Sequence, residues 1–371
     1  MLCIVSVVDS VSPTSMPINE FVLYRHTHDT TAKQVLIVCA PPSSAGVALP
    51  NDLTVYYTEN SLKTLRGTVK KIMAECRENG DRAVFHLHHI KSAARFFVAC
   101  YGLGVRKQSL FTVHSTFNKR DLKYKLVSTF CVLCARRVTC VSHAAYLGYN
   151  PVLKALKGKS MFAVPNGVDT ERIDRALAAE PSGHTPTYDS KRKTLICVGR
   201  MIPLKNHAFL IRLLAKLPEH TLLLVGAEDS EGKIRALAKE YGVFDRVRFL
   251  GLIPRAEVFR TLTQAGIYLS SSLVEGLPVS VLEAMRAGLL PILSDIPPHT
   301  EIAAHCDGVC VLPLDETKWA DKIGEYTALT ESAAKERAAA LSAAVENEYS
   351  LKKMHAAYDV HYRALAAKQR K

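Results

Sequence analysis

Two glutamates, Glu275 and Glu283, bracket a Gly-Leu-Pro sequence that follows an apolar, strand-like run. Gly276 permits a tight turn close to a ligand, and Pro278 suits the first turn of a helix. The backbone amides near Gly276 and Leu277 would then lie at a helix N-terminus, which favours a diphosphate group. Glu283 can accept hydrogen bonds from a ribose diol, and Glu275 is expected to face the sugar of such a ligand.

A second candidate segment places two cations after another strand-like run. Gly199 ends the run, and Arg200 and Lys205 follow in the loop before the next helical pattern. Two positive side chains at the carboxyl end of a strand suit a diphosphate whose negative charge grows as it leaves. Alone, this segment would be interpreted as a solvated basic loop. Together with the glutamate segment, it indicates a nucleotide-diphosphate site.

Both segments belong to a repeated strand–helix pattern. Short β-rich apolar runs alternate with helical patterns such as 208–216, 232–240 and 279–287, and most runs lack strict apolar–polar alternation. Such runs are typical of parallel strands buried on both faces, and their alternation with helices predicts right-handed βαβ units in doubly wound sheets. Eleven strands are predicted, at residues 2–8, 35–39, 84–87, 109–113, 138–141, 161–164, 194–198, 221–225, 247–250, 266–269 and 290–293.

Eleven strands are too many for one small Rossmann-like sheet, so we predict two such α/β domains, residues 1–165 and 166–349. The pattern lapses between 166 and 193, where residues 180–186 are rich in turn formers. A last helical pattern within 350–371 is predicted to pack back on the first domain. Ligands of open α/β sheets bind beyond the carboxyl ends of the strands, so two domains facing each other across a cleft would bind two substrates.

These motifs resemble those of family 4 glycosyltransferases of the GT-B fold. The resemblance is dense over residues 161–305, loose over 84–160 and weak before that. It implies enzymes that retain the anomeric configuration, need no metal ion, and expel the nucleoside diphosphate on the face where the acceptor attacks. The residues that carry it are Gly199, Arg200, Lys205, Glu275 and Glu283, with the segments 164–169 and 249–254 and the helical segment from Ser350 through Met354.

The resemblance also implies roles for individual residues. Arg200 and Lys205 would bind the donor diphosphate, Glu283 the ribose and Glu275 the donor sugar. His114, after the strand at 109–113, matches an active-site histidine near the donor sugar and the acceptor. The implied catalytic set is His114, Glu275, Arg200 and Lys205, and the implied nucleotide-sugar set is Arg200, Lys205, Gly251, Ile253, Glu275, Gly276, Leu277, Val279 and Glu283.

The loop after the first strand departs from the family pattern, which commonly is rich in glycine there. Residues 9–20 contain no glycine but have hydroxyls, amides and two prolines. We predict that Ser15 and Asn19 of this loop shape the acceptor pocket; a plain βα connection is the alternative. His88 or His89, after a later strand, is a further acceptor-binding candidate. Ser142 is another, because the resemblance matches it to a serine on the donor or the acceptor side. A metal site at His86 through His89 is disfavoured because no carboxylate or cysteine lies close in sequence, so hydrogen-bonded histidines are expected.

Composition limits the class of protein. The 371 residues are 48% hydrophobic and 22% charged, which excludes a disordered chain, a collagen or a coiled coil. No run reaches the roughly 18–20 apolar residues of a membrane span, and Asp9 interrupts the first apolar run before a signal sequence could form. The ten cysteines lack framework spacing, and Cys131 and Cys134 are interpreted as small hydrophobes on a helix. We therefore expect a cytoplasmic chain with reduced thiols.

The positive charge is concentrated in the first half of the chain. Residues 1–165 hold 21 Lys and Arg against 9 Asp and Glu, whereas residues 166–371 hold 27 against 26. The excess lies in two predicted helices, 62–77 and 119–137, and suggests an anionic partner such as the inner face of the cytoplasmic membrane. A solvated basic face is the alternative. Nucleic acid is disfavoured because the aromatic residues are scattered.

The leading hypothesis is a retaining glycosyltransferase that transfers a sugar to a lipid-linked or membrane-surface acceptor in polysaccharide or cell-envelope synthesis. The donor is expected to be a UDP-sugar rather than a GDP-sugar, from frequency within the family. No cofactor or metal is expected: an Asp-x-Asp motif is absent, and Asp229-Ser230-Glu231 is the nearest sequence. Two alternatives are a nucleotide-sugar epimerase and a non-catalytic nucleotide-sugar-binding subunit. Glu275 and Glu283 with Arg200 and Lys205 favour transfer over epimerisation. A non-catalytic chain would be expected to lack His114, Lys205 or Glu275, and all three are present.

Overall fold

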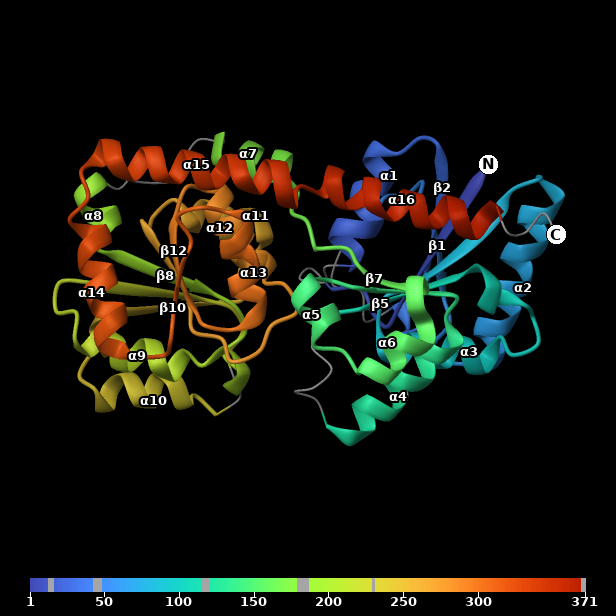
Figure 1. The fold of residues 1–371 in the computed structure, drawn as a ribbon, viewed down its shortest axis with the longest axis horizontal. Helices are drawn as coiled ribbons and strands as arrows, with labels where there is room; N and C mark the ends of the chain where they lie inside the picture. Colours follow the sequence, from blue (N-terminus) through green and yellow to red (C-terminus); the bar gives the residue numbers. More distant parts are fainter. Residues whose placement is uncertain (13–16, 43–48, 115–120, 179–186, 229–230, 368–371) are drawn as a thin grey trace. The chain divides into compact units, whose positions relative to one another are not determined.

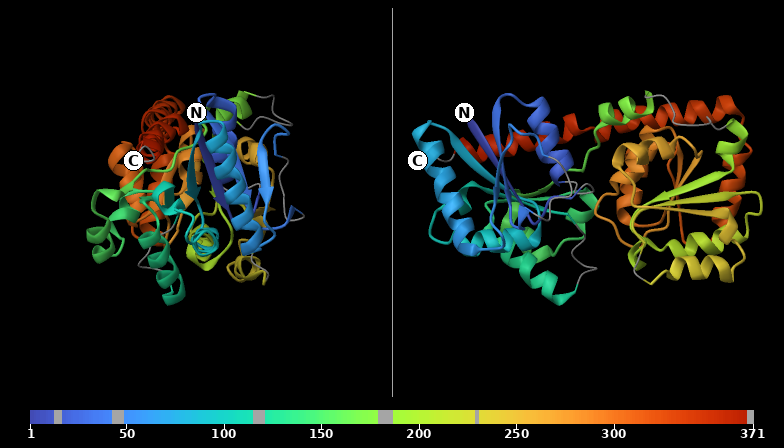
Figure 2. Two further views of the ribbon diagram at one scale, coloured as in Figure 1. Left: turned by 90° about the vertical axis from the view of Figure 1, so that its right-hand side faces the viewer. Right: turned by 180° about the vertical axis from the view of Figure 1, so that it is seen from behind.

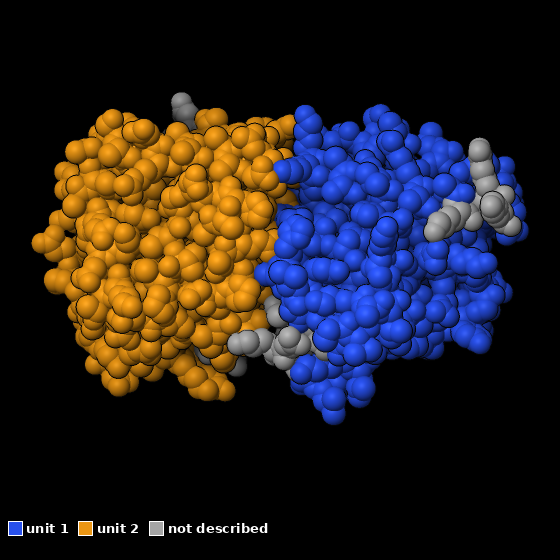
Figure 3. All heavy atoms as spheres, viewed as in Figure 1, with its two compact units in different colours: residues 1–166, 351–371 blue, residues 167–350 orange. Residues whose placement is uncertain are grey.

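The computed structural model describes residues 1–12, 17–42, 49–114, 121–178, 187–228 and 231–367. The chain divides into two compact α/β units, coloured separately in Figure 3. Unit 1 contains Met1–Asn166 and Leu351–Lys371, and unit 2 contains Gly167–Ser350. The C-terminal helix therefore belongs to the same unit as the N-terminal strands.

Unit 1 is built on a parallel sheet of seven strands in the order β3-β2-β1-β4-β5-β6-β7. The order reverses between β1 and β4, which are neighbours in register from Leu2 opposite Arg82 to Val7 opposite Leu87. The strands are β1 (Leu2–Val8), β2 (Ala32–Val38), β3 (Thr54–Tyr57), β4 (Arg82–Leu87), β5 (Ser109–Val113), β6 (Arg137–Cys140) and β7 (Met161–Ala163).

Helices cover both faces of this sheet, because successive strand residues point to opposite faces. Cys3 and Val5 of β1 pack in one apolar cluster with α2, α3 and α4, whereas Ile4 packs in another with α16 (Figures 1 and 2). The helical segments are the π-helix η1 (Pro17–Leu23), α1 (Tyr24–His28), α2 (Leu62–Glu78), α3 (Ile90–Ala99), η3 (Val105–Gln108), α4 (Leu122–Cys134), α5 (His143–Leu147), α6 (Pro151–Lys157), η4 (Gly158–Ser160) and α16 (Leu351–Ala367).

The face of α16 that the sequence pattern makes apolar is the buried face. Its residues Leu351, Met354 and Leu365 lie in the core with Val84 of the sheet. Two tyrosines of the same face are buried against polar strand residues: the hydroxyl of Tyr358 is 3.0 Å from Oγ1 of Thr139, and that of Tyr362 contacts His86. The helix thus supplies one layer of the unit 1 core.

Unit 2 is built on a parallel sheet of six strands in the order β10-β9-β8-β11-β12-β13. Strands β8 and β11 are neighbours at the centre, so the strand order reverses there. The strands are β8 (Thr194–Val198), β9 (Thr221–Val225), β10 (Val247–Gly251), β11 (Ile267–Ser270), β12 (Leu290–Ser294) and β13 (Cys310–Leu312).

One large apolar core holds unit 2 together and includes Trp319, the only tryptophan of the chain. Trp319 packs edge-to-face on Phe209 at a centroid distance of 5.0 Å. The helical segments are α7 (Thr170–Ala178), α8 (Tyr188–Arg192), η5 (Pro203–Lys205), α9 (His207–Ala215), α10 (Lys233–Glu240), η6 (Phe244–Arg246), α11 (Arg255–Leu262), α12 (Val279–Arg286), α13 (Pro297–His305), α14 (Glu316–Thr327) and α15 (Glu331–Tyr349).

The predicted fold class, two doubly wound parallel α/β sheets, is confirmed. All eleven predicted strands are present with ends within three residues of the prediction, and β3 and β13 are additional. All ten cysteines are free thiols, and eight of them are buried. Among the described helices, none combines the length and the apolar character that a bilayer crossing requires.

Candidate active site

The two charged segments lie on neighbouring loops at the switch point of the unit 2 sheet. One loop follows β8 and contains Arg200 and Lys205, and the other follows β11 and contains Glu275. Where the strand order of an open α/β sheet reverses, loops leave adjacent strands in opposite directions and open a crevice at the carboxyl edge. The topology therefore brings together two segments that are about seventy positions apart in the sequence.

Lys205 and Glu275 are in direct contact. The Nζ of Lys205 donates to Oε1 of Glu275 over 2.5 Å, and the Oγ of Ser272 donates to the same oxygen over 2.7 Å. The exposed fractions of the two charged side chains are 24% and 11%, so the pair is sheltered but reachable. A cation and a carboxylate are thus held side by side at the carboxyl edge of the sheet.

Backbone contacts hold the two loops against each other. The amide of Leu273 donates to the carbonyl of Leu204 over 2.8 Å, and the Oγ of Ser271 donates to the carbonyl of Asn206 over 2.9 Å. Asn206 has a left-handed backbone with φ of 53°, which asparagine tolerates better than most residues. These contacts fix the backbone position of Lys205 and so limit the positions that its side chain can adopt.

Two glycines make room at the start of the first loop. Gly199 lies under Lys205, because a Cβ added at Gly199 would be 3.5 Å from the Cε of the lysine. Gly226, after β9, has φ of +139°, and a Cβ there would come within 2.2 Å of the Gly199 carbonyl oxygen. Arg200 follows directly and is exposed, so its guanidinium is accessible to a ligand.

Helix α12 carries the second glutamate. Pro278 precedes the helix at its N-cap position instead of lying in its first turn, and the helix begins at Val279. Glu283 is buried in the second turn and accepts a hydrogen bond from Nη2 of Arg255, the first residue of α11. The side chain of Leu277 is buried in the unit 2 core, so what it can offer a ligand is its backbone.

Gly251 and Ile253 lie between β10 and α11. Gly251 ends β10 with φ of +66°, and its carbonyl accepts a hydrogen bond from the amide of Gly226 over 2.8 Å. Ile253 is half-buried against the unit 2 core. Both predicted residues are therefore on the loop next to the β9 loop, at the same edge of the sheet as Arg200.

A buried histidine that the sequence reasoning missed supports the second loop. His299 of α13 donates from Nδ1 to the carbonyl of Ser294 over 2.7 Å, and its Nε2 is 3.4 Å from the Oγ of Ser270. The Ser270 hydroxyl is in turn 3.4 Å from that of Ser272, which bonds to Glu275. Burial lowers the pKa of His299, so the ring is neutral at pH 7. The sequence signal that could have identified His299 is its position shortly after Ser294, the serine that ends β12.

Three histidines gather at the switch point of the unit 1 sheet. His88 and His89 follow β4, and His114 follows β5. The ring of His114 is 5.9 Å from the rings of both, measured between centroids. Among the described residues, no group hydrogen-bonds to either ring nitrogen of His88 or to Nε2 of His114. The two predicted residues are thus neighbours at one edge of the sheet.

His86 has a structural role. Its Nδ1 is 2.6 Å from the hydroxyl of Tyr362 and its Nε2 is 2.7 Å from Oγ1 of Thr112, all of them buried. The prediction that it is hydrogen-bonded is confirmed, but it lies in the core rather than at the sheet edge. In the parts of the chain that the structure describes, no group of three or more His, Cys, Asp or Glu side chains could hold a metal ion.

The remaining acceptor candidates lie on separate elements. Asn19 is buried in η1, and Ser142 caps α5 by accepting a hydrogen bond from the amide of Ala145 over 2.9 Å. Ser142 therefore has at least a structural role. Ser15 lies outside the described residues, as do the first two residues of Asp229-Ser230-Glu231.

Acidification is expected to destabilise unit 1. Burial and the nearby Arg25 guanidinium lower the pKa of His355 to about 3, whereas an unfolded histidine titrates near about 6.5. As the pH falls below that value, the unfolded chain takes up a proton that the folded chain excludes, so the free energy of unfolding falls. At pH 5 the loss from this residue is about 2 kcal/mol. Burial lowers the pKa of His86 and His88 too, which adds in the same direction.

Urea unfolding at pH 7 and pH 5 checks this prediction. Circular dichroism follows both units, and the fluorescence of Trp319 follows unit 2 alone. His355→Gln should reduce the acid-induced loss, whereas His143→Gln, a change at an exposed histidine of the same unit, should not. Equal stability of unit 1 at the two pH values would contradict it.

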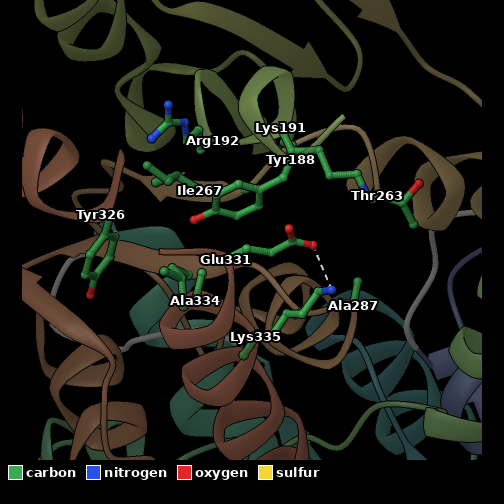
Figure 4. A pocket seen from close by; sticks show the side chains of 15 residues that line it. Tyr188, Lys191, Arg192, Thr263, Ile267, Ala287, Tyr326, Glu331, Ala334 and Lys335 are labelled. Atoms are coloured by element: carbon green, nitrogen blue, oxygen red, sulfur yellow. Dashed lines mark ion pairs between the residues drawn. The ribbon is translucent and has the colours of Figure 1, made fainter. Parts of the chain in front are cut away.

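A separate hollow lies at the opposite edge of the unit 2 sheet. It has a volume of about 390 Å³ and is lined by residues that precede or begin strands, such as Arg192 and Ile267 (Figure 4). Glu331 and Lys335 form an ion pair of 2.7 Å in its wall. None of the predicted site residues lines it, so the candidate active site remains the carboxyl edge.

The loops after β8 and β11 lie within a region of the chain that is similar to known proteins. Residues 185–342 match the family model described as Glycosyl transferases group 1. A phosphatidylinositol N-acetylglucosaminyltransferase component of Arabidopsis thaliana is 24% identical over 276 residues, which are 70% of this chain and 59% of that protein. The GDP-mannose:cellobiosyl-diphosphopolyprenol alpha-mannosyltransferase of Xanthomonas oryzae pv. oryzae is 34% identical over 147 residues, 38% of this chain and 36% of that protein. The solved structure of Anabaena HepE in complex with UDP and glucose matches with a TM-score of 0.77 over 98% of this chain and 100% of that one, at 16% identity.

The fold is therefore GT-B, with two parallel-sheet α/β domains of seven and six strands. Residues 185–342, which contain both charged segments, match the group 1 glycosyltransferase family model. The match spans 59% and 36% of the lengths of the two curated relatives.

Proposed function

We propose that the chain transfers a sugar from a nucleotide-diphosphate donor to an acceptor hydroxyl with retention of the anomeric configuration, as in family 4. The contact between Lys205 and Glu275 supports this most directly, since it puts a cation and a carboxylate 2.5 Å apart at the switch point of unit 2. A diphosphate needs the positive charge, and sugar hydroxyls need the carboxylate. Exposed Arg200, five residues before Lys205, adds a second cation.

In the proposed binding mode the donor lies along the carboxyl edge of unit 2. Arg200 and Lys205 bind the diphosphate, together with the backbone of Gly276, Leu277 and Val279 at the start of α12, where amides without helical partners favour anions. The carboxylates are then assigned by position: Glu283 to the ribose and Glu275 to the donor sugar. Gly251 and Ile253 contribute backbone contacts to the base.

The proposed reaction breaks the bond between the sugar C1 and the diphosphate oxygen. The acceptor oxygen forms a new bond to C1 on the same face, and its proton passes to the departing phosphate oxygen. Negative charge grows on the leaving nucleoside diphosphate, where Arg200 and Lys205 stabilise it. His114 would act beside the donor sugar and the acceptor.

We further propose a lipid-linked acceptor in glycan synthesis, with unit 1 as the acceptor-binding domain. The name of the plant relative includes phosphatidylinositol, and the name of the Xanthomonas relative includes a diphosphopolyprenol. Both are anionic lipids. The excess of Lys and Arg in the first 165 residues would attract such an acceptor. His88, Asn19 and Ser142 are the described residues proposed to contact it, and Ser15 is proposed with them.

Calorimetric titration with UDP, GDP and ADP tests the donor site without knowledge of the sugar. We expect one diphosphate to bind selectively, with UDP favoured. Glu283→Ala is expected to weaken that binding about 10- to 100-fold, because hydrogen bonds from a ribose diol to a buried carboxylate are lost.

Glu240→Ala is the matched control, since it removes the same charge from an exposed position of α10 in the same unit. It should bind as the unchanged chain does. Failure of all three diphosphates to bind would overturn the proposal and favour a non-catalytic chain. Equal affinity in Glu283→Ala would remove Glu283 from the site.

A further inference from the structure

Helix α4 of unit 1 presents large apolar side chains to solvent. Leu122, Leu126, Phe130 and Leu133 recur at intervals of three to four residues, so they form one continuous stripe along the helix. Their exposed fractions lie between 40% and 71%. The side that packs on the unit is instead formed by smaller residues, including Ser128, Cys131 and Val132. We call the four exposed residues the α4 stripe.

The apolar surface continues onto the neighbouring elements. α4 packs against α3 and α6, and in Figure 1 it lies at the lower edge of unit 1 beside them. Tyr101, just after α3, and Leu156 of α6 are largely exposed and line a hollow of about 730 Å³ together with Phe130 and Leu133. An exposed apolar surface of this extent is uncommon on a chain with no partner and marks an interaction site.

The same surface is positive, since Arg106, Lys107, Arg136 and Lys157 line the hollow and no acidic residue does. The stretch of chain that carries it is also strongly basic. Residues 82–168 contain 14 Lys and Arg against one acidic residue, Asp121, a net charge of +13 that equals the net charge of the whole chain. The carboxylate of Asp121 accepts a hydrogen bond from the amide of Tyr124 and caps α4. Lys107 and Arg136 are exposed at the border of the hollow. Burial, with repulsion from Arg136 and Arg106, lowers the pKa of Lys157 in the same wall, as expected where few acids balance the cations.

The charge selects among possible occupants of this surface. A second copy of the chain would bring another surface of the same sign, and the two would repel each other. An anionic bilayer supplies both complements at once, since its headgroups attract Lys and Arg and its acyl region accepts leucine and phenylalanine side chains. Because the exposed apolar side chains occupy one side of α4, the contact would be with the surface of the bilayer.

We propose that the α4 stripe and the basic residues around it dock unit 1 on the surface of a membrane rich in anionic lipid. Helix α2, the other basic helix predicted to contact lipid, is not part of this surface. Its one large exposed apolar residue is Leu62, Arg66 bonds to the carbonyls of Ala99 and Tyr101, and Lys71 pairs with Glu75. The docking surface is distinct from the donor site, so it stands or falls separately from the proposed transfer reaction.

Flotation with lipid vesicles tests the proposal on the full chain. We expect binding to vesicles that contain one part phosphatidylglycerol to three parts phosphatidylcholine, weak binding to phosphatidylcholine alone, and loss of binding as salt rises above about 0.15 M. Leu126→Gln combined with Phe130→Gln should lower the bound fraction at least about tenfold, because two apolar side chains no longer enter the bilayer. Lys107→Gln combined with Arg136→Gln should lower it severalfold.

Lys63→Gln combined with Lys70→Gln is the matched control, since it removes two exposed positive charges from α2 in the same unit. It should bind vesicles nearly as the unchanged chain does, and UDP titration and circular dichroism should be unaltered in all three variants. No binding to anionic vesicles, or undiminished binding by the α4 variant, would overturn the proposal. An equal loss of vesicle binding in the α2 variant would also overturn it, because it would indicate that binding depends on positive charge alone and not on this surface. A dimer that the α4 variant abolishes, with no vesicle binding, would instead identify a second copy as the occupant.

Discussion

Lys205→Met is expected to lower kcat about 100- to 1,000-fold, as the loss of one preorganised charge does at other sites where negative charge develops. The Nζ of Lys205 is held at the carboxyl edge of unit 2 by Glu275, and its stem lies over Gly199. Methionine has a similar length but no charge, so the loop should keep its shape. The assay is turnover of the nucleotide sugar whose diphosphate binds in the calorimetric titration.

Two further variants separate charge from structure. Lys318→Met removes a positive charge from an exposed position of α14 in the same unit, and it should leave kcat unchanged. Lys205→Arg keeps the charge but spreads it over a planar group, so partial activity is expected. An unchanged kcat in Lys205→Met, with the diphosphate still bound, would mean that the leaving group is stabilised elsewhere.

The order of strands and helices could be predicted because most strands here are buried on both faces. A run such as 221–225, with four of five residues buried, is apolar throughout and easily distinguished from its flanks. The two strands that were missed, β3 and β13, each lie at one edge of a sheet, as do β7 and β10, which were predicted. The two missed strands have only four and three residues, all half-buried. Although their residue types favour strands, each run is too short to be recognised with the sequence pattern alone.

The residues of the candidate site that could be predicted are those on loops that follow strands. Arg200, Lys205 and Glu275 all have this position, so the topology alone brings them to one edge. Arg255 and His299 could not be found in this way, because each acts through a contact with a distant residue. Arg255 bonds to Glu283 across 28 positions, and His299 to Ser270 across 29.

The orientation of α4 could not be predicted either. The sequence of this helix is apolar on most sides, so its pattern does not reveal which side is buried. A preference for burying the largest apolar side chains would turn Leu126 and Phe130 inward. In the fold, the small side chains of Ser128 and Cys131 allow close approach to the unit, and the hydroxyl of Ser128 bonds to that of Tyr149 over 2.6 Å.

Gly226→Ala is expected to lower the free energy of unfolding of unit 2 by about 3 kcal/mol or more and to impair the donor site. At Gly226 the added Cβ would meet the Gly199 carbonyl oxygen at 2.2 Å and its carbon at 2.6 Å. Those atoms are backbone, so the clash can be relieved only by moving the start of the Arg200 loop. The φ of +139° is in addition one that alanine rarely adopts, and the two effects together reach the range of severe single substitutions.

Gly242→Ala distinguishes the clash from the backbone strain. Gly242 has φ of +67° in the same unit, but a Cβ there would have nothing within 4 Å. Its substitution should cost only about 1–2 kcal/mol of left-handed strain and should not affect diphosphate affinity. Urea unfolding followed by Trp319 fluorescence measures both variants. If Gly226→Ala were no more destabilising than Gly242→Ala and bound the diphosphate equally well, the close approach of the β8 and β9 loops would not be needed to hold Arg200 and Lys205 in place.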